Sequence, residues 1–113
     1  MKSKILALSK NEEFKKLLEE KKVSNKYVTI FFGYLNNKSI KKLNISFVTK
    51  KKIGNAVKRN KIKRRLRNIM NDAVKKISIK FKYSYLVIAK STMLNNEFNN
   101  IKETLFQEFE RIR

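Results

Sequence analysis

The feature that most constrains this chain is a long basic segment near its middle, Lys50–Arg67. The segment carries ten Lys and Arg side chains and no Asp or Glu. Apolar residues recur through it and beyond it at a helical period, so we expect an amphipathic helix whose charged side stays outside the core. This helix should run from about Asn55 to Ile77. Its apolar positions are Ile62, Leu66, Ile69, Met70, Ala73 and Ile77.

The charges on this helix oppose its stability. Arg59, Lys63 and Arg67 are spaced four residues apart, and like charges at that spacing destabilise a helix by about 0.2–0.5 kcal/mol per pair. Lys58 and Arg59 also lie in the first turn, where the helix dipole is already positive, at a cost of about 0.3–1 kcal/mol each. A bound anion would relieve both conflicts, because the free N–H groups of a helix N-terminus bind phosphate. The segment therefore predicts a phosphate-binding surface.

The whole chain shares this excess of positive charge. Its 113 residues include 29 Lys and Arg against 9 Asp and Glu, which gives a formal net charge of +20. Such a charge repels itself in a compact protein, so we expect a polyanionic partner, with nucleic acid first and an anionic membrane surface second. A membrane-surface helix would need bulky apolar residues over one whole face, which this segment lacks. A helix-turn-helix DNA reader would need a helix, not the strand predicted here, before Gly54.

The candidate contact residues lie on the helix and just before it. Gly54 allows a close backbone approach or a left-handed turn, and Asn55 can cap the helix. Asn60 can hydrogen-bond a base edge or a sugar hydroxyl, and arginine offers a planar fork that suits phosphate and guanine. The candidate RNA-binding residues are Lys51, Lys52, Asn55, Lys58, Arg59, Asn60, Lys61, Lys63, Arg64 and Arg67.

Catalytic residues are not indicated in the polypeptide. The chain has no Cys and no His, which excludes disulfides and imidazole acid–base chemistry. No acid lies between Lys21 and Asn71, and all nine acids fall on predicted helices rather than in a carboxylate cluster for Mg²⁺. The apolar run Ile5–Leu8 is too short for a signal peptide, and no stretch approaches the roughly 20 apolar residues of a membrane span. We therefore expect a soluble, cytoplasmic binding protein.

The remaining elements predict an α+β fold in the order α-β-β-α-β-α, within one RNA-binding domain over residues 1–113. The first strand should form a hairpin with the second, and the second should form a βαβ unit with the last. The third strand is almost wholly apolar, so we expect it to be central and buried. Besides the long helix, the expected elements are a helix from Lys10, strands at Lys26–Leu35, Leu43–Thr49 and Tyr83–Ala89, and a helix from near Asn96.

The segment Lys51–Arg67, KKIGNAVKRNKIKRRLR, resembles the signature of the bacterial ribonuclease P protein subunit. That family carries an RNR block on a long helix. Here the block reads Arg59-Asn60-Lys61, so the last position keeps its charge but loses the bidentate fork. The resemblance extends to Asn11–Phe14 and to Tyr85–Lys90, and so covers nearly the whole chain. It implies a ribosomal-protein-like fold with a left-handed βαβ crossover, the opposite of the general rule.

The resemblance also implies a division of labour. In that family the RNA subunit hydrolyses the phosphodiester bond with Mg²⁺ and removes the 5′ leader of precursor tRNA. The protein, expected at 1:1, docks on this RNA through the basic helix and holds the leader in a cleft between the first helix and the sheet. Phe14 and Phe31 match aromatic cleft positions, whereas Leu18 stands where the family often has another aromatic.

Two readings stay open at this stage. Without the resemblance, Phe14 and Phe31 are better explained as ordinary core residues. A non-enzymatic RNA-binding protein of ribosomal type would share the charge, size and fold of this chain. The block KIGNAVKRNKIKRRLR is what favours ribonuclease P over that alternative, because a generic ribosomal protein need not have it.

Overall fold

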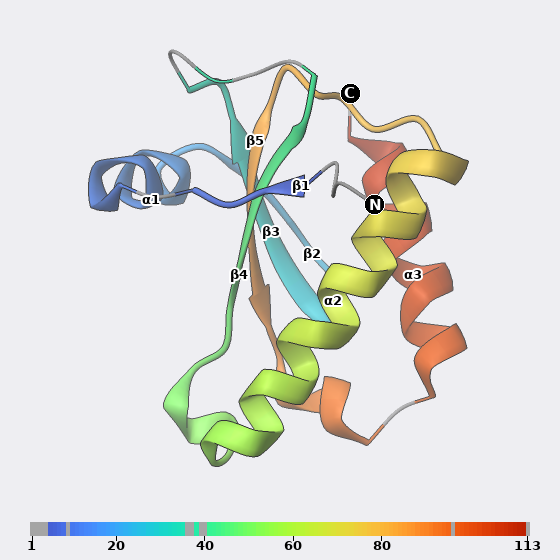
Figure 1. Ribbon diagram of the computed structural model, residues 1–113. Coiled ribbons are helices and arrows are strands. Elements are labelled where there is room, and N and C mark those ends of the chain that lie inside the picture. Colours follow the sequence, from blue (N-terminus) through green and yellow to red (C-terminus); the bar gives the residue numbers. More distant parts are fainter. Residues whose placement is uncertain (1–4, 9, 36–37, 39–40, 96, 113) are drawn as a thin grey trace.

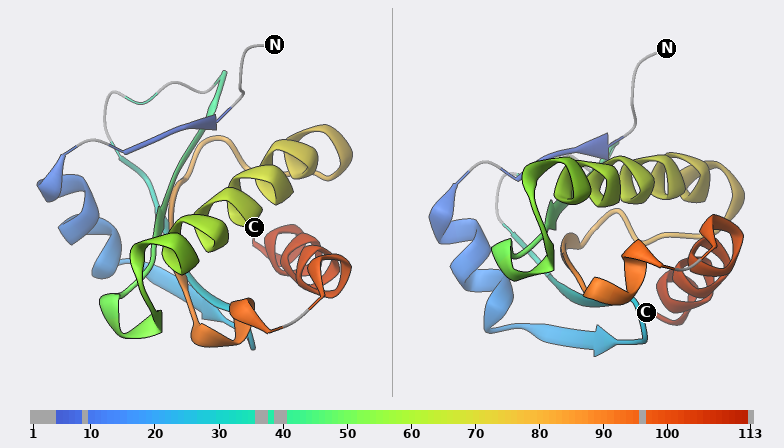
Figure 2. Two further views of the ribbon diagram at one scale, coloured as in Figure 1. Left: turned by 60° about the horizontal axis from the view of Figure 1, so that its bottom comes forward. Right: turned by 90° about the horizontal axis from the view of Figure 1, so that it is seen from below.

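Five strands form one mixed sheet, with α2 and α3 on one face and α1 on the other (Figures 1 and 2). The computed structural model describes residues 5–8, 10–35, 38, 41–95 and 97–112. The strands lie in the order β1-β4-β5-β3-β2. The elements are β1 Ile5–Leu6, α1 Asn11–Leu18, β2 Lys21–Ser24, β3 Val28–Gly33, β4 Leu43–Val48, α2 Ala56–Lys76, β5 Ser84–Ala89 and α3 Phe98–Arg111, with short 3₁₀ helices at Lys51–Ile53 and Ser91–Leu94.

Strand β5 is central, as predicted, because both of its faces are apolar. Tyr85 and Val87 are buried in the core under α2 and α3, and Leu86 is buried in a smaller cluster that includes α1 residues. Its neighbours are β4, which runs parallel to it, and β3, which runs antiparallel. The predicted hairpin between the first two strands is wrong, since β3 and β4 each pair with β5. A hairpin between them would leave this almost wholly apolar strand at an edge of the sheet.

The long basic helix forms almost as predicted and supplies the crossover. α2 is capped by Asn55 and ends before Ile77, and it joins the parallel neighbours β4 and β5. In Figure 1 both strands run downward, β4 passes in front of β5, and α2 lies to their right. This arrangement makes the crossover left-handed, as the family resemblance implied.

The two edge strands, β1 and β2, were not predicted from the sequence. β2 pairs antiparallel with β3, but its Lys21 and Lys22 are exposed and hide the pattern of a strand. Short edge strands rich in lysine are common, because their charge prevents further strand addition. β1 pairs in parallel with only the start of β4. The predicted helix starts are near those observed, with α1 beginning at Asn11 and α3 at Phe98; Asn96 itself is outside the described residues.

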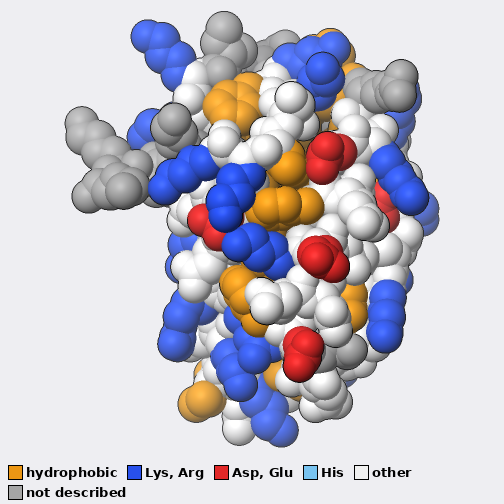
Figure 3. All heavy atoms as spheres, turned by 90° about the vertical axis from the view of Figure 1, so that its right-hand side faces the viewer, with side chains coloured by type: hydrophobic (Ala, Val, Ile, Leu, Met, Phe, Trp, Pro, Cys, Tyr) orange, Lys and Arg blue, Asp and Glu red, His pale blue; other side chains and the backbone are white. Residues whose placement is uncertain are grey.

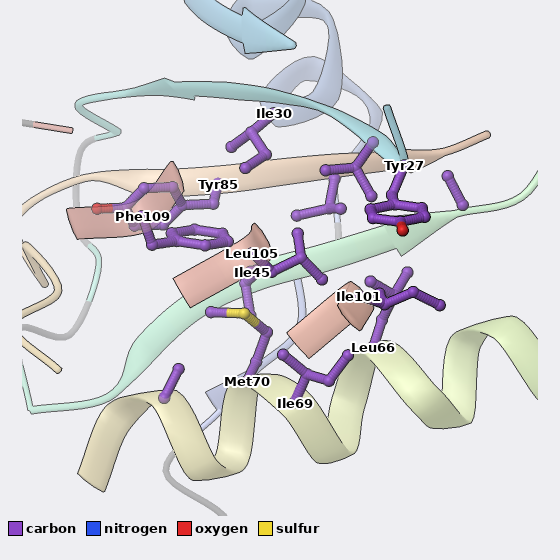
Figure 4. Packing of buried hydrophobic residues seen from close by; sticks show 14 of the residues in the cluster. Tyr27, Ile30, Ile45, Leu66, Ile69, Met70, Tyr85, Ile101, Leu105 and Phe109 are labelled. Carbon is purple, nitrogen blue, oxygen red and sulfur yellow. The ribbon is translucent and has the colours of Figure 1, made fainter. Parts of the chain in front are cut away.

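The main core lies between the sheet and the two helices of its covered face (Figure 4). Leu66 and Met70 of α2 belong to the same buried cluster as Ile45 of β4, and Phe109 of α3 lies against Tyr85, with ring centroids 5.4 Å apart. The hydroxyl of Tyr85 donates a hydrogen bond of 2.7 Å to the carbonyl of Lys80. Burial raises the pKa of Tyr85 well above its usual range, so this phenol stays neutral and serves as a structural donor.

Glu108 ties α3 to the turn between β2 and β3. This carboxylate is only 9% exposed and accepts a hydrogen bond of 3.1 Å from the side-chain amide of Asn25. The other end of that amide, Oδ1, accepts bonds of 2.8 and 3.0 Å from the backbone N–H groups of Tyr27 and Val28. One buried acid thereby orients the residue that shapes the turn.

We predict that Glu108→Ala lowers the free energy of unfolding by about 1–3 kcal/mol, because it leaves the half-buried Asn25 amide without this acceptor. Glu108→Gln keeps an acceptor oxygen and should cost less. Glu110→Ala, on the exposed side of the same helix, is the matched control and should change stability by no more than about 0.5 kcal/mol. Urea unfolding measures all three. Equal losses for Glu108→Ala and Glu110→Ala would contradict the role given to the bond between Glu108 and Asn25.

Candidate nucleic-acid interface

The start of α2 is held in a fixed geometry. The side chain of Asn55 accepts a hydrogen bond of 3.0 Å from the backbone N–H of Lys58, as an N-cap does. Gly54 before it has φ 159° and ψ −167°, a region of backbone space occupied almost only by glycine. A Cβ at Gly54 would also come within 2.8 Å of the Lys58 side chain. The cap and the glycine thus present the exposed Lys51 and Lys52 just before the helix.

The basic residues of α2 divide by exposure. Arg59 and Lys63 are half-buried beside the core side of the helix, and the Nε of Arg59 is buried with no hydrogen-bond partner among the described residues. Arg65 turns inward, where its Nη1 donates to the carbonyl of Met93 at 3.3 Å. The predicted residues within α2 that are exposed are Lys58, Asn60, Lys61, Arg64 and Arg67.

A groove of about 440 Å³ joins the basic helix to one of the predicted cleft residues. Phe14 of α1 lies on one side of it, and Lys63 and Arg67 of α2 lie on another. The groove opens because β1 covers only the first two residues of β4. A combination of apolar surface and basic side chains suits single-stranded nucleic acid, whose bases stack and whose phosphates are charged. The other lining residues are Ile5, Ala7, Ile45, Ser46, Phe47 and Val48.

The three predicted cleft residues have different surroundings. Phe14 and Phe31 are both half-buried and belong to the same small apolar cluster around Leu17. The Nζ of Lys22 lies 5.9 Å from the centroid of the Phe31 ring, which does not line the groove. Leu18 is 49% exposed and is not among the groove residues either. The structure therefore brings Phe14 together with the basic helix and leaves Leu18 on the surface.

A second cavity, of about 580 Å³, lies where β4 and β5 end. It contains Lys52, which was predicted, together with Lys50 and Lys90, which were not among the candidate site residues. The Nζ of Lys90 is fixed by bonds of 2.5 Å to the carbonyl of Asn25 and 2.9 Å to the hydroxyl of Ser24. Lys90 could have been found from sequence, because it follows a buried strand and parallel neighbours end at one edge, where ligands bind. The remaining lining residues are Thr29, Ile53, Ile88, Ala89, Ser91 and Thr92.

Asp72, the one acidic residue in the sequence of α2, lies outside the groove. On α2, Asp72 forms an ion pair of 2.5 Å with Lys102 of α3, and the hydrogen bond from that lysine lowers the pKa of the carboxyl. Figure 3 shows the face covered by α3, where acidic side chains stand among hydrophobic and basic ones.

Within the described ranges, no group of three or more His, Cys, Asp or Glu residues could hold a metal ion. No described helix is long and apolar enough to cross a membrane.

Fold and surface together define a class: a small α+β protein with a left-handed crossover and a basic groove suited to a polyanion. The family model described as Ribonuclease P matches residues 3–113, and the chain belongs to this family.

Individual relatives agree with this assignment. The chain is 35% identical over 102 residues to the ribonuclease P protein component of Carboxydothermus hydrogenoformans, covering 87% of this chain and 83% of that one. It is 33% identical over 98 residues to the component from Mesoplasma florum, covering 87% and 86%. Among solved structures, the RNase P protein from Thermotoga maritima superposes with a TM-score of 0.80 at 24% identity over 96% of this chain and 98% of that one. The last comparison bears on the fold alone.

Substitutions of the cap residue Asn55 should affect stability and anion binding differently. We predict that Asn55→Ala lowers the free energy of unfolding by about 0.5–2 kcal/mol, because the N–H of Lys58 loses its acceptor. Asn55→Asp keeps an acceptor and adds a favourable charge at the helix N-terminus, so its stability should equal or exceed that of the wild type. The same aspartate should weaken binding of a polyanion. Thermal unfolding measures the stability of the variants, and filter binding measures their affinity for a polyanion. If Asn55→Asp lost as much stability as Asn55→Ala, Asn55 would not act as the helix cap.

Proposed function

We propose that this chain is the protein subunit of ribonuclease P, which binds the catalytic RNA of the holoenzyme and the 5′ leader of precursor tRNA. The observation that carries this proposal is the groove in which Phe14 meets Lys63 and Arg67. In this groove the basic side chains can bind phosphates, and the ring of Phe14 can stack on a base. Membership of the ribonuclease P family supports endonucleolytic maturation of tRNA 5′ ends as the reaction, and we propose that it takes place in the cytoplasm.

Binding to the RNA subunit is assigned to the exposed side of α2 and the turn before it. Lys58, Lys61 and Arg64 are exposed there, and no acid occurs in the sequence between Lys21 and Asn71. Phosphates placed against this row would remove the repulsion between its charges and occupy the positive end of the helix dipole. Arg59, which is half-buried on the same helix, is assigned to the same contact. We propose one protein for each RNA subunit.

The leader is assigned to the groove and to the apolar cluster beside it. Phe14 offers a ring within the groove, and Phe31 lies in the same cluster with a lysine over its face. Stacking of one base on an aromatic ring is worth about 1–3 kcal/mol. Leu18 has no ring, so the contribution of this position to leader binding should be smaller than that of an aromatic.

The chemistry is assigned to the RNA. Hydrolysis of the phosphodiester needs Mg²⁺ to activate water and to stabilise the developing charge. This chain has no His, and its few acids fall outside the basic segment, so we assign Mg²⁺ mainly to the RNA subunit. The role of the polypeptide is then to position the substrate and to offset the repulsion between two RNAs.

We predict that Arg59→Ala and Arg64→Ala each weaken binding to the RNA subunit roughly tenfold, because each removes a charged hydrogen bond to phosphate. Each should also reduce the slope of log K against log salt by about one, since fewer counterions are released. Arg111→Ala, an exposed arginine on α3, is the matched control and should leave both quantities unchanged. A salt slope that stays constant in the α2 variants would argue against a phosphate-facing helix.

The holoenzyme provides the second test. The purified protein should stimulate cleavage of precursor tRNA by its cognate catalytic RNA at low Mg²⁺, because its positive charge replaces part of the cation requirement. The protein without that RNA should leave the substrate intact. Gel analysis of the released leader measures both reactions. Cleavage by the protein alone, in a preparation free of contaminating nuclease, would refute the assignment of the chemistry to RNA.

A further inference from the structure

An exposed tyrosine lies at the end of the sheet opposite the start of α2. Tyr34 directly follows β3 and is 58% exposed. Its ring contacts Tyr83, which precedes β5, edge-on with centroids 5.1 Å apart. Tyr83 in turn contacts Phe32, with centroids 5.4 Å apart. Tyr83 and Phe32 already close this end of the core, so packing does not explain why a further large ring extends into solvent.

Basic side chains surround this ring. The Nζ of Lys82 lies 5.2 Å from the centroid of Tyr83 and 5.9 Å from that of Tyr34. A shallow cavity of about 200 Å³ lies beside the pair and is also lined by Lys16 and Lys21. Its other lining residues are one acid, Glu20, together with Phe32 and Gly33. The local balance among these charged groups is therefore three lysines to one acid.

This cluster is separate from the interface described above. β3 runs for six residues, roughly 20 Å at 3.3 Å per residue, and Tyr34 lies beyond its far end. The start of α2 lies at the opposite end of the sheet (Figure 1). The 200 Å³ cavity shares no lining residue with the groove or with the larger cavity at Lys52.

We propose that Tyr34, Tyr83 and Lys82 form a second RNA-contact platform, on which an unpaired base of the bound RNA stacks against Tyr34. Lys16 and Lys21 then lie beside the flanking phosphates. An exposed ring held by a second ring and flanked by cations is the arrangement that binds unstacked bases. A protein partner is disfavoured, because lysine is depleted at the centres of protein interfaces. This inference rests on the proposal that the chain binds RNA.

The test uses a short fluorescent oligouridylate and fluorescence anisotropy. Tyr34→Ala should weaken binding by about 5- to 150-fold, the equivalent of one lost stacking contact. It removes no charge, so the salt slope should not change. Tyr34→Phe keeps the ring and should bind within about twofold of wild type. Lys82→Gln should weaken binding and lower the salt slope. Thermal unfolding followed by circular dichroism confirms that each variant is folded.

The outcomes distinguish the platform from the function on which it rests. If Arg59→Ala and Arg64→Ala weaken oligouridylate binding while Tyr34→Ala leaves it unchanged, the platform is refuted and RNA binding by α2 stands. If Tyr34→Phe loses as much affinity as Tyr34→Ala, the hydroxyl rather than the ring makes the contact, and stacking is refuted. If the wild type does not bind RNA, the proposed function itself fails.

Discussion

The rest of the structure depends on the burial of one side of α2 against the sheet. Leu66 and Met70 are almost completely inaccessible to solvent, and they hold in place a helix whose charges would otherwise disfavour it. Full burial of a side chain of this size contributes about 1.5–3 kcal/mol, more than each adverse charge pair or dipole contact costs. The core can therefore maintain cations on the rest of the helix surface, among them Lys63 and Arg67, which line the groove with Phe14.

Much of this fold follows from local sequence patterns. The helical period of α2 and the continuous apolar character of β5 are properties of contiguous residues, so both elements and the central position of β5 were predicted. The edge strand β2 was not predicted, because its exposed lysines are equally typical of a solvent-exposed loop. The partner of β3 was also mistaken. Adjacent strands in the sequence favour a hairpin, whereas the actual pairing is decided by the need of β5 for two neighbours, which is a property of the whole sheet.

The candidate site was predictable to a similar degree. The charge pattern identified the basic helix, but periodicity could not show that Arg65 bonds the carbonyl of Met93 while Lys63 and Arg67 line the groove with Phe14. These assignments depend on which elements lie beside α2. The groove itself depends on the shortness of β1, and the fixed ammonium of Lys90 on a turn far away in the sequence. Three-dimensional neighbours of this kind leave no pattern in the sequence.

The repulsive rows on α2 have a consequence for the free protein. An anion that binds only the folded form stabilises it by mass action, by about 2.7 kcal/mol at a concentration one hundred times its dissociation constant. Because binding and folding are linked in this way, free protein is less stable than RNA-bound protein, and a larger fraction of it is unfolded. Unfolded chains are the ones that proteases degrade. The same charges that recognise a polyanion would thereby couple the amount of surviving protein to the amount of its partner.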